Sequence, residues 1–188
     1  FLSAEAQARR PADSISWTMV QDFEARTGLT LPTEAQWEYA ARGGNDASRF
    51  FEGWDGGPGL GQVAWYESEN RSSTRAIGRG SHAPNQYGLH DVYGNVSEWC
   101  EDVYIADFYS QLENGSRNPL ATEAGNTLRV LRGGDYIDSL RPQANVFDWT
   151  PDFNRLRSAA REALPEDTTG DCHPGAPGFR VVFNLPTE

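Results

Sequence analysis

The chain has 188 residues, enough to bury one hydrophobic core, and its 38% hydrophobic and 12% aromatic residues indicate a globular domain rather than a disordered one. Its 27 acidic and 16 basic residues leave a net charge of −11, which disfavours binding to nucleic acid or to anionic lipid. No apolar run approaches the roughly 20 residues that span a bilayer, so we expect no direct insertion into a membrane.

The first predicted helix covers residues 17–27. Ser16 precedes it as an N-cap, and Gly28 follows it, where the left-handed conformation that ends many helices favours glycine. Its inner face is predicted from helical spacing: Trp17, Val20 and Phe23.

The second predicted helix begins at Thr33, where Thr33-Glu-Ala-Gln36 forms a capping box in the Thr-x-x-Gln form. Gly43-Gly44 is expected to end it. Its inner face is predicted to consist of Trp37, Ala40 and Ala41.

Short strands are predicted after these helices, at residues 97–101, 127–133 and 178–184. In the last of them Phe179, Val181 and Phe183 alternate with other residues, the pattern of one buried strand face. Residues 45–85 are rich in Gly, Ser and Asn, which is typical of ordered loops.

Four ordered blocks carry a family resemblance. Leu31-Pro-Thr-Glu-Ala-Gln-Trp-Glu-Tyr-Ala-Ala-Arg-Gly-Gly44 closely resembles the signature helix of the sulfatase-modifying-factor, or formylglycine-generating-enzyme-like, domain. The others are residues 85–99 with their Gly-Asn-Val-x-Glu-Trp core, Arg129-Val-Leu-Arg-Gly-Gly134, and Arg157-Ser-Ala-Ala-Arg161 followed by Gly178-Phe-Arg180. The resemblance covers nearly the whole chain.

This resemblance implies an α+β, C-type-lectin-like fold with a small twisted antiparallel sheet, two main helices and long loops. We expect one domain over residues 1–188 that lacks the family's N-terminal strand region. Phe1-Leu-Ser-Ala-Glu-Ala-Gln-Ala8 reads as the end of a helix, which predicts that a targeting segment or a piece of the domain is missing upstream. The location in the cell stays open, with export or display on the cell surface among the alternatives.

A metal site is implied at Asp91-Val-Tyr-Gly-Asn-Val-Ser-Glu98. The matching segment of the family's enzymes resembles a calcium site, with side-chain ligands at the positions of Asp91 and Glu98 and carbonyl ligands near Gly94 and Val96. Carboxylate and carbonyl oxygens are what calcium prefers. The alternative is that Glu98 pairs with an arginine, for example Arg132 or Arg180.

The arginines of the shared blocks have two interpretations. Arg132, Arg157, Arg161 and Arg180 could form an anion pocket, but buried pairs with carboxylates are favoured. Every basic residue of the chain is arginine, the side chain best suited to such pairs.

Catalysis in the aerobic formylglycine-generating enzymes depends on a pair of copper(I)-binding cysteines just after the Arg-Gly-Gly block. Here that stretch, residues 135–145, contains no cysteine, and Cys100 and Cys172 belong to other blocks. We therefore do not expect copper, and the sequence favours a protein that is not an enzyme. The sequence does not decide whether the two cysteines form a disulfide.

Candidate ligand-binding residues lie in the segments that depart most from the family, 135–153 and 166–177. Aromatic and arginine side chains on loops of a rigid scaffold are typical of binding surfaces. The candidates are Asp135, Tyr136, Asp138, Phe147, Trp149, Phe153, Cys172 and His173.

The favoured function is therefore a non-catalytic protein that binds a protein or small-molecule ligand through these loops. Variable proteins of diversity-generating retroelements share this fold and diversify the stretch between the Arg-Gly-Gly and Gly-Phe-Arg blocks. Ordinary sequence drift explains the departure of this stretch from the family at least equally well. The alternatives are a formylglycine-generating oxidase acting on a sulfatase cysteine and a structural subunit of a larger assembly. An N-terminal fragment or other subunits are the partners that this last alternative implies.

Overall fold

A four-stranded sheet forms the centre of the computed structural model, which describes residues 8–44, 63–66, 73–77, 82–137, 155–169 and 177–183. Its strands are β3 (Glu98–Val103), β4 (Leu128–Arg132), β5 (Glu162–Pro165) and β6 (Gly178–Phe179), in the order β5-β4-β3-β6. β4 is antiparallel to both of its neighbours, whereas β3 and β6 are parallel. The sheet is therefore mixed: the expected α+β fold with a small sheet is confirmed, and the parallel β3–β6 pair departs from the antiparallel arrangement that was expected.

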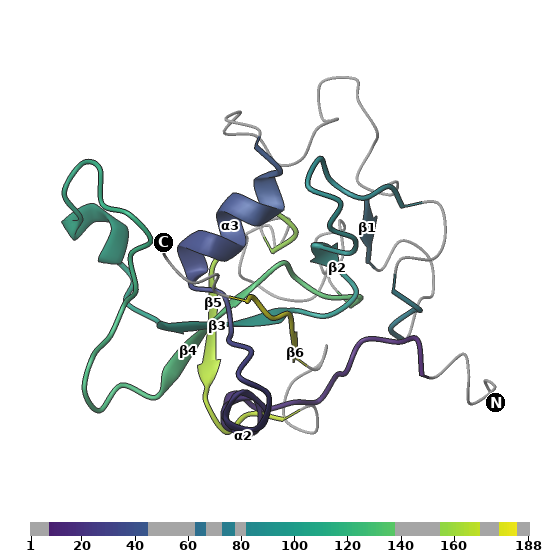
Figure 1. Ribbon diagram of the computed structural model, residues 1–188, viewed down its shortest axis with the longest axis horizontal. Coiled ribbons are helices and arrows are strands. Elements are labelled where there is room, and N and C mark those ends of the chain that lie inside the picture. The colour runs from purple at the N-terminus through teal and green to yellow at the C-terminus, as the bar shows by residue number, and fades with distance from the viewer. Residues whose placement is uncertain are drawn as a thin grey trace, which may run out of the picture.

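Two helices lie on opposite sides of this sheet, α2 (Trp17–Thr27) and α3 (Glu34–Arg42), as Figure 1 shows. Alternate residues of a strand point to opposite faces, so β3 contributes to both sides. Trp99 packs in one cluster with Trp17 and Val20 of α2. Its neighbour Cys100 packs in the other cluster with Trp37 and Ala41 of α3. The fold thus has three layers with a hydrophobic core on each face of the sheet.

The structure confirms the predicted bounds of α2. The Ser16 side chain accepts a hydrogen bond from the Met19 N–H at 3.2 Å, and Gly28 ends the helix with φ of 73°. Trp17 and Val20 are buried as predicted. Phe23 is half-buried and packs edge-on against Phe179 of β6, with 5.3 Å between ring centroids.

The structure also confirms the start and the end of α3. Both hydrogen bonds of the capping box are present, between Thr33 and Gln36, and Gly43 adopts φ of 60° after the last turn. Trp37 and Ala41 are buried as predicted, whereas Ala40 is only half-buried. The sequence interpretation missed the third buried position, Glu34, because a carboxylate is rarely buried without a partner.

Several short elements escaped prediction. β1 (Ala64–Trp65) and β2 (Tyr93–Gly94) form a small parallel pair, and η2 (Phe108–Gln111) is a turn of 3₁₀ helix. η2 belongs to the long connection between β3 and β4, which projects from the body of the molecule on the left of Figure 1. Strands of two residues are too short to produce a recognisable alternation of polar and apolar positions.

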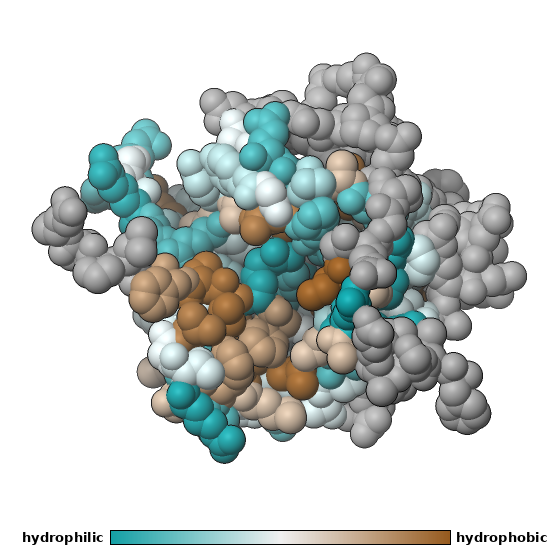
Figure 2. Space-filling view, turned by 45° about the vertical axis from the view of Figure 1, so that its right-hand side comes forward, coloured by the Kyte–Doolittle hydropathy of each residue, from teal (hydrophilic) through white to brown (hydrophobic). Residues whose placement is uncertain are grey.

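The predicted strand 178–184 is wrong in its extent and in its buried face. β6 ends at Phe179, and beyond it a single bridge joins Val182 to Thr30. Val181 and Phe183 are 37% and 67% exposed. β6 is an edge strand, and α2 reaches this face only as far as the Phe23–Phe179 contact, so in the described ranges no helix or strand covers Val181 and Phe183. A hydrophobic area is visible on the molecular surface in Figure 2.

None of the helices in the described part of the chain is long and apolar enough to cross a membrane.

Candidate functional site

The first candidate binding loop leaves the sheet directly after β4, through Gly133 and Gly134. Gly133 has φ of 92°, and a Cβ there would lie 2.9 Å from the carbonyl oxygen of Val92 and 3.1 Å from the Trp37 ring. A residue with a side chain at position 133 would therefore have to displace one of these neighbours. The two glycines therefore fix the position and direction in which the backbone of the first candidate loop leaves the sheet.

Asp135 and Tyr136 are the candidate ligand-binding residues of this loop that the structure describes. Asp135 is buried at 2% exposure, and its Oδ1 accepts a hydrogen bond from the Ile137 N–H at 2.7 Å. Tyr136 is half-buried. Burial raises the pKa of its phenol, and the carboxylates of Asp135 and Asp13 add to that effect. The Tyr136 side chain is thus partly exposed and lies beside the buried carboxylate of Asp135.

Asn95 connects this loop to two other segments, a role that the sequence interpretation missed. Its carbonyl oxygen accepts the Tyr136 N–H at 3.2 Å, and its own N–H donates to the Trp65 carbonyl at 2.7 Å. Its side chain bonds both to the N–H of Arg75, at 3.0 Å, and to the carbonyl of Arg75, at 3.2 Å. Asn95 has φ of 67°, which asparagine tolerates better than most residues, and this preference was the available signal.

The second candidate loop returns to the sheet at Pro177 and Gly178. The Gly178 N–H donates to the Ser97 carbonyl at 2.8 Å, and a Cβ at Gly178 would lie 2.5 Å from the carbonyl oxygen of Ala12. These close contacts fix the backbone position at which the second loop ends, just as those of Gly133 fix the position at which the first loop begins.

The start of the first loop and the end of the second both lie beside Glu98, the first residue of β3. Arg132, the last residue of β4, pairs with Glu98 from one side, and Gly178, the first residue of β6, pairs with it from the other. Because β4 runs antiparallel and β6 parallel to β3, one loop leaves and the other returns at the same end of the sheet.

The predicted calcium ligands lie at this same end, but the side chain of Glu98 is engaged. Both of its oxygens bind Arg180, Oε2 to Nε and Oε1 to Nη2, each at 2.6 Å. The Trp37 indole N–H donates to Oε2 at 2.6 Å. Burial works against the charge of Arg180, but Glu98 outweighs it and raises the arginine pKa. The alternative interpretation, an arginine pair with Arg180, is the observed arrangement.

The other predicted calcium ligands lie in the residues that precede β3. Asp91 has φ of 52° and is half-buried, the buried Gly94 ends β2, and Val96 lies in the buried turn before β3. An ion held by Asp91, Gly94, Val96 and Glu98 would have to displace Arg180 from Glu98. The calcium site stays a prediction under that condition. In the described ranges there is no group of three or more His, Cys, Asp and Glu side chains arranged to hold a metal.

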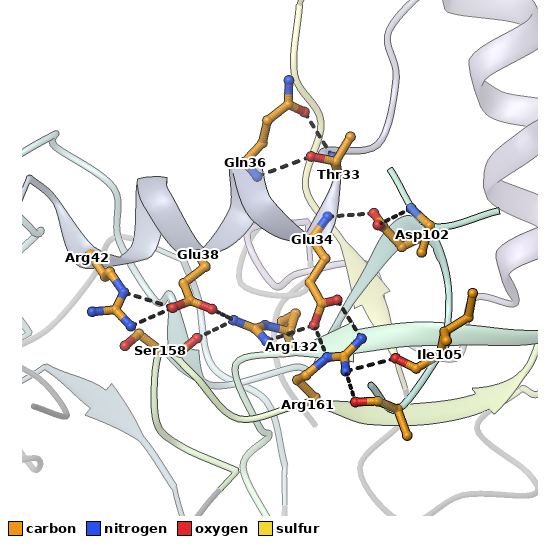
Figure 3. A network of polar contacts seen from close by, with 12 residues as sticks. Thr33, Glu34, Gln36, Glu38, Arg42, Asp102, Ile105, Arg132, Ser158 and Arg161 are labelled. Atoms are coloured by element: carbon orange, nitrogen blue, oxygen red, sulfur yellow. Dashed lines mark hydrogen bonds and ion pairs between the residues drawn. The ribbon is translucent and has the colours of Figure 1, made fainter. Parts of the chain in front are cut away.

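A second network of charges joins α3 to the sheet (Figure 3). Glu34, fully buried, accepts hydrogen bonds from Arg132 at 2.9 Å and from Arg161 at 2.7 and 2.9 Å. Arg132 also binds Glu38 at 2.5 Å and the Ser158 carbonyl. For Arg132, Arg161 and Arg180 the favoured interpretation of carboxylate pairs is confirmed.

Cys100 is a free thiol with no exposed surface. Its side chain lies in the core beside Trp37, Val130 and Leu156. Burial raises the pKa of the thiol well above its ordinary value, so Cys100 is held in its unreactive, protonated form.

The remaining candidate ligand-binding residues lie outside the described part of the chain. They are Asp138, Phe147, Trp149, Phe153, Cys172 and His173.

These features define a loop-rich α+β domain in which one candidate loop begins and the other ends at the same end of a mixed sheet, and in which networks of arginine and carboxylate hold the scaffold. The chain belongs to the family of sulfatase-modifying factor enzyme 1-like domains, whose model matches residues 2–185.

Relatives in this family differ in activity. The chain is 35% identical over 136 residues to the formylglycine-generating enzyme of Thermomonospora curvata, covering 68% of this chain and 45% of that protein. It is 31% identical over 171 residues to the inactive C-alpha-formylglycine-generating enzyme 2 of Mus musculus, covering 86% and 46%. The chain therefore spans about half the length of these curated relatives.

Among solved structures, the fold resembles that of Treponema denticola variable protein 1. The TM-score is 0.68 at 23% identity, and the match covers 96% of this chain and 73% of the other. At that identity the likeness concerns the fold alone.

Proposed function

We propose that this chain is a non-catalytic binding protein that recognises a protein or small-molecule ligand through segments 135–153 and 166–177. The carrying observation is that the first segment begins and the second ends beside Glu98, because this arrangement would let two stretches far apart in sequence contribute to one surface. The Asn95 hydrogen bonds and the tight glycines at the loop roots supply the rigid base that a binding surface needs.

The state of the cysteines argues against the oxidase alternative. Copper(I) chemistry needs soft thiolate ligands within reach of each other. Residues 135–145 contain no cysteine, and the Cys100 thiol is buried with a raised pKa. Membership of the family does not itself imply activity, since one relative is named as inactive. The fold likeness to Treponema denticola variable protein 1 supports the more specific proposal that this chain is a variable protein of a diversity-generating retroelement.

The experiment is a comparative capture of partners from extracts of the source cells. The baits are the wild-type chain, a Tyr136→Ala/Trp149→Ala variant, and a Tyr39→Ala variant as matched control, since Tyr39 is an exposed aromatic outside the loops. A partner retained by the wild type and by Tyr39→Ala, but lost from the double variant at unchanged melting temperature, supports the proposal. Equal retention of every partner by all three baits contradicts it.

A parallel assay addresses the oxidase alternative. The chain is titrated with Cu(I) and then supplied with oxygen and a peptide containing a sulfatase-type cysteine, with aldehyde formation followed by mass spectrometry. We expect neither stoichiometric copper binding nor aldehyde. An aldehyde product would replace the binding proposal with the enzyme.

A further inference from the structure

One motif of the chain has no part in the proposed function, the exposed pair Asn114-Gly115. It lies in the projecting connection between β3 and β4 (Figure 1). The Ser116 N–H donates to the Glu113 carbonyl at 3.1 Å, which closes a turn around the pair. Asn114 and Gly115 are both exposed, Gly115 has φ of 89°, and a Cβ on it would meet no atom within 4 Å. Both partners of this peptide bond are thus open to solvent and unhindered.

The side chain of Asn114 differs from those of the other asparagines in the described ranges. Asn85 donates to the Ala40 carbonyl at 2.7 Å, and Asn95 is held by Arg75. Asn118 accepts a hydrogen bond from Thr33 at 3.2 Å, and Asn126 donates to the Tyr104 carbonyl at 3.1 Å. No hydrogen bond in the described ranges holds the Asn114 amide. Asn114 is also the one asparagine in the whole sequence that is followed by glycine.

We propose that Asn114 is a site of spontaneous deamidation, with water as the only co-reactant. The backbone nitrogen of Gly115 loses its proton and attacks Cγ of Asn114, and a new C–N bond closes a five-membered succinimide ring. The side-chain nitrogen leaves as ammonia with the protons it needs from solvent. Water then adds to one of the two ring carbonyls and breaks its C–N bond. The product is aspartate or, when the former backbone carbonyl is attacked, isoaspartate.

The surroundings of the turn favour this chemistry at Asn114. Glycine has no side chain to obstruct the approach of its nitrogen to Cγ, and its backbone samples more conformations than that of any other residue. Hydrogen-bonded amides, as at Asn85 and Asn126, must first break their contacts. The amide of Asn118 cannot react by this route, because the next residue, Pro119, has no N–H.

The reaction adds a negative charge to the tip of the connection, one residue from Glu113, and isoaspartate also lengthens the backbone there. The base of the connection is anchored through residues outside the turn 113–116. The Ala121 N–H donates to Asp102 at 2.9 Å, and Arg161 donates to the carbonyls of Ile105 and Ala106 at 3.0 Å. We therefore expect the modified protein to keep its fold and its melting temperature.

The test is an incubation of the folded chain at mildly alkaline pH, followed by proteolysis and peptide mass analysis. The peptide that contains Asn114 should gain the mass difference between OH and NH2. Its isoaspartate should accept a methyl group from protein isoaspartyl methyltransferase. Peptides with Asn85 and Asn126 should stay unchanged over the same period, and the rate at Asn114 should rise with pH because the attacking nitrogen must be deprotonated.

Two variants make the test specific. Gly115→Asp keeps a residue that tolerates positive φ but places a side chain beside the attacking nitrogen, and Asn114→Gln would require a larger ring. Asn114→Gln should keep the wild-type melting temperature, whereas Gly115→Asp should fold with a slightly lower one because φ of 89° strains any side chain. Both should react at least several-fold more slowly. Conversion of Gly115→Asp as fast as the wild type, or conversion of Asn85 and Asn126 before Asn114, would overturn the proposal.

Discussion

Glu98 and Arg180 form a two-point ion pair, with both distances at 2.6 Å, although 82 residues separate them in the chain. Glu98 begins the central strand β3, and Arg180 follows directly after the edge strand β6. Arg180 also donates to the His90 carbonyl at 3.3 Å. The pair therefore joins the segment 85–99 to the C-terminal part of the sheet, at the end where the first candidate binding loop begins and the second ends.

This ion pair predicts a strong coupling between the two side chains. Glu98 is 6% exposed and Arg180 is 23% exposed, so removing one charge leaves the other poorly solvated. We expect Glu98→Gln and Arg180→Gln each to lower the free energy of unfolding, with a coupling of roughly 2–3 kcal/mol in a double-mutant cycle. Urea unfolding of the four proteins measures it. A coupling near zero would mean that the pair contributes nothing to stability.

Calcium binding provides a second prediction, because an ion at Asp91 and Glu98 must compete with Arg180. A ligand that binds only the folded state raises the melting temperature. Calcium should therefore raise the melting temperature of Arg180→Gln more than that of the wild type, and should have no effect on Glu98→Gln. Magnesium at equal ionic strength serves as the control. A larger calcium effect on the wild type than on Arg180→Gln would refute competition.

The buried carboxylate of Glu34 provides a third prediction. Arg132 and Arg161 both bind it, and Arg132 has no exposed side-chain surface. Glu34→Gln leaves two guanidinium groups without their shared charge and should cost about 3 kcal/mol or more of the free energy of unfolding. Arg42→Gln is the matched control. It removes an i,i+4 pair with Glu38 at the surface and should cost no more than about 0.5 kcal/mol.

Tyr93 provides a prediction for alkaline pH. Its hydroxyl is buried and donates to the Ala41 carbonyl at 3.2 Å, and burial raises its pKa from 10.0 to about 12. A raised pKa means that the folded state holds the proton more tightly than the unfolded state does. The resulting stabilisation is complete below the unfolded pKa of 10.0 and is lost as the pH rises towards 12.

A two-unit shift corresponds to roughly 2–3 kcal/mol. Urea unfolding should therefore show that the wild type loses more stability than Tyr93→Phe between about pH 9 and about pH 12. At neutral pH the variant should be weaker by about 1 kcal/mol, because it lacks the hydrogen bond to Ala41. Equal losses for both proteins at alkaline pH would show that Tyr93 ionises without a shift.

The helices were predictable because their limits depend on residues a few positions apart. Ser16 bonds the N–H of Met19, and Thr33 bonds that of Gln36, both within one turn. The same holds for Gly28 and Gly43, which end their helices in the left-handed conformation that glycine favours. The family could be inferred too, because four ordered blocks carry it along nearly the whole chain.

Other features depended on segments that meet only in the folded protein. From the sequence, Glu98 could bind calcium, Arg132 or Arg180, and the parallel pairing of β3 with β6 brings Arg180 to it. Glu34 is buried because Arg132 and Arg161 arrive from β4 and from just before β5. Val181 and Phe183 alternate like a core strand, yet they are exposed because no described layer covers that edge.

The segment 85–99 illustrates both sides of this division. It is one of the four blocks that carry the family resemblance, and the preferences of Gly94 and Asn95 for positive φ are local properties. Its partners are not local. Trp65, Arg75, Gly133 and Gly178 contact it from four separate stretches. Only the tertiary structure, by making hydrogen bonds across those distances, decided that the first candidate binding loop begins and the second ends beside this segment.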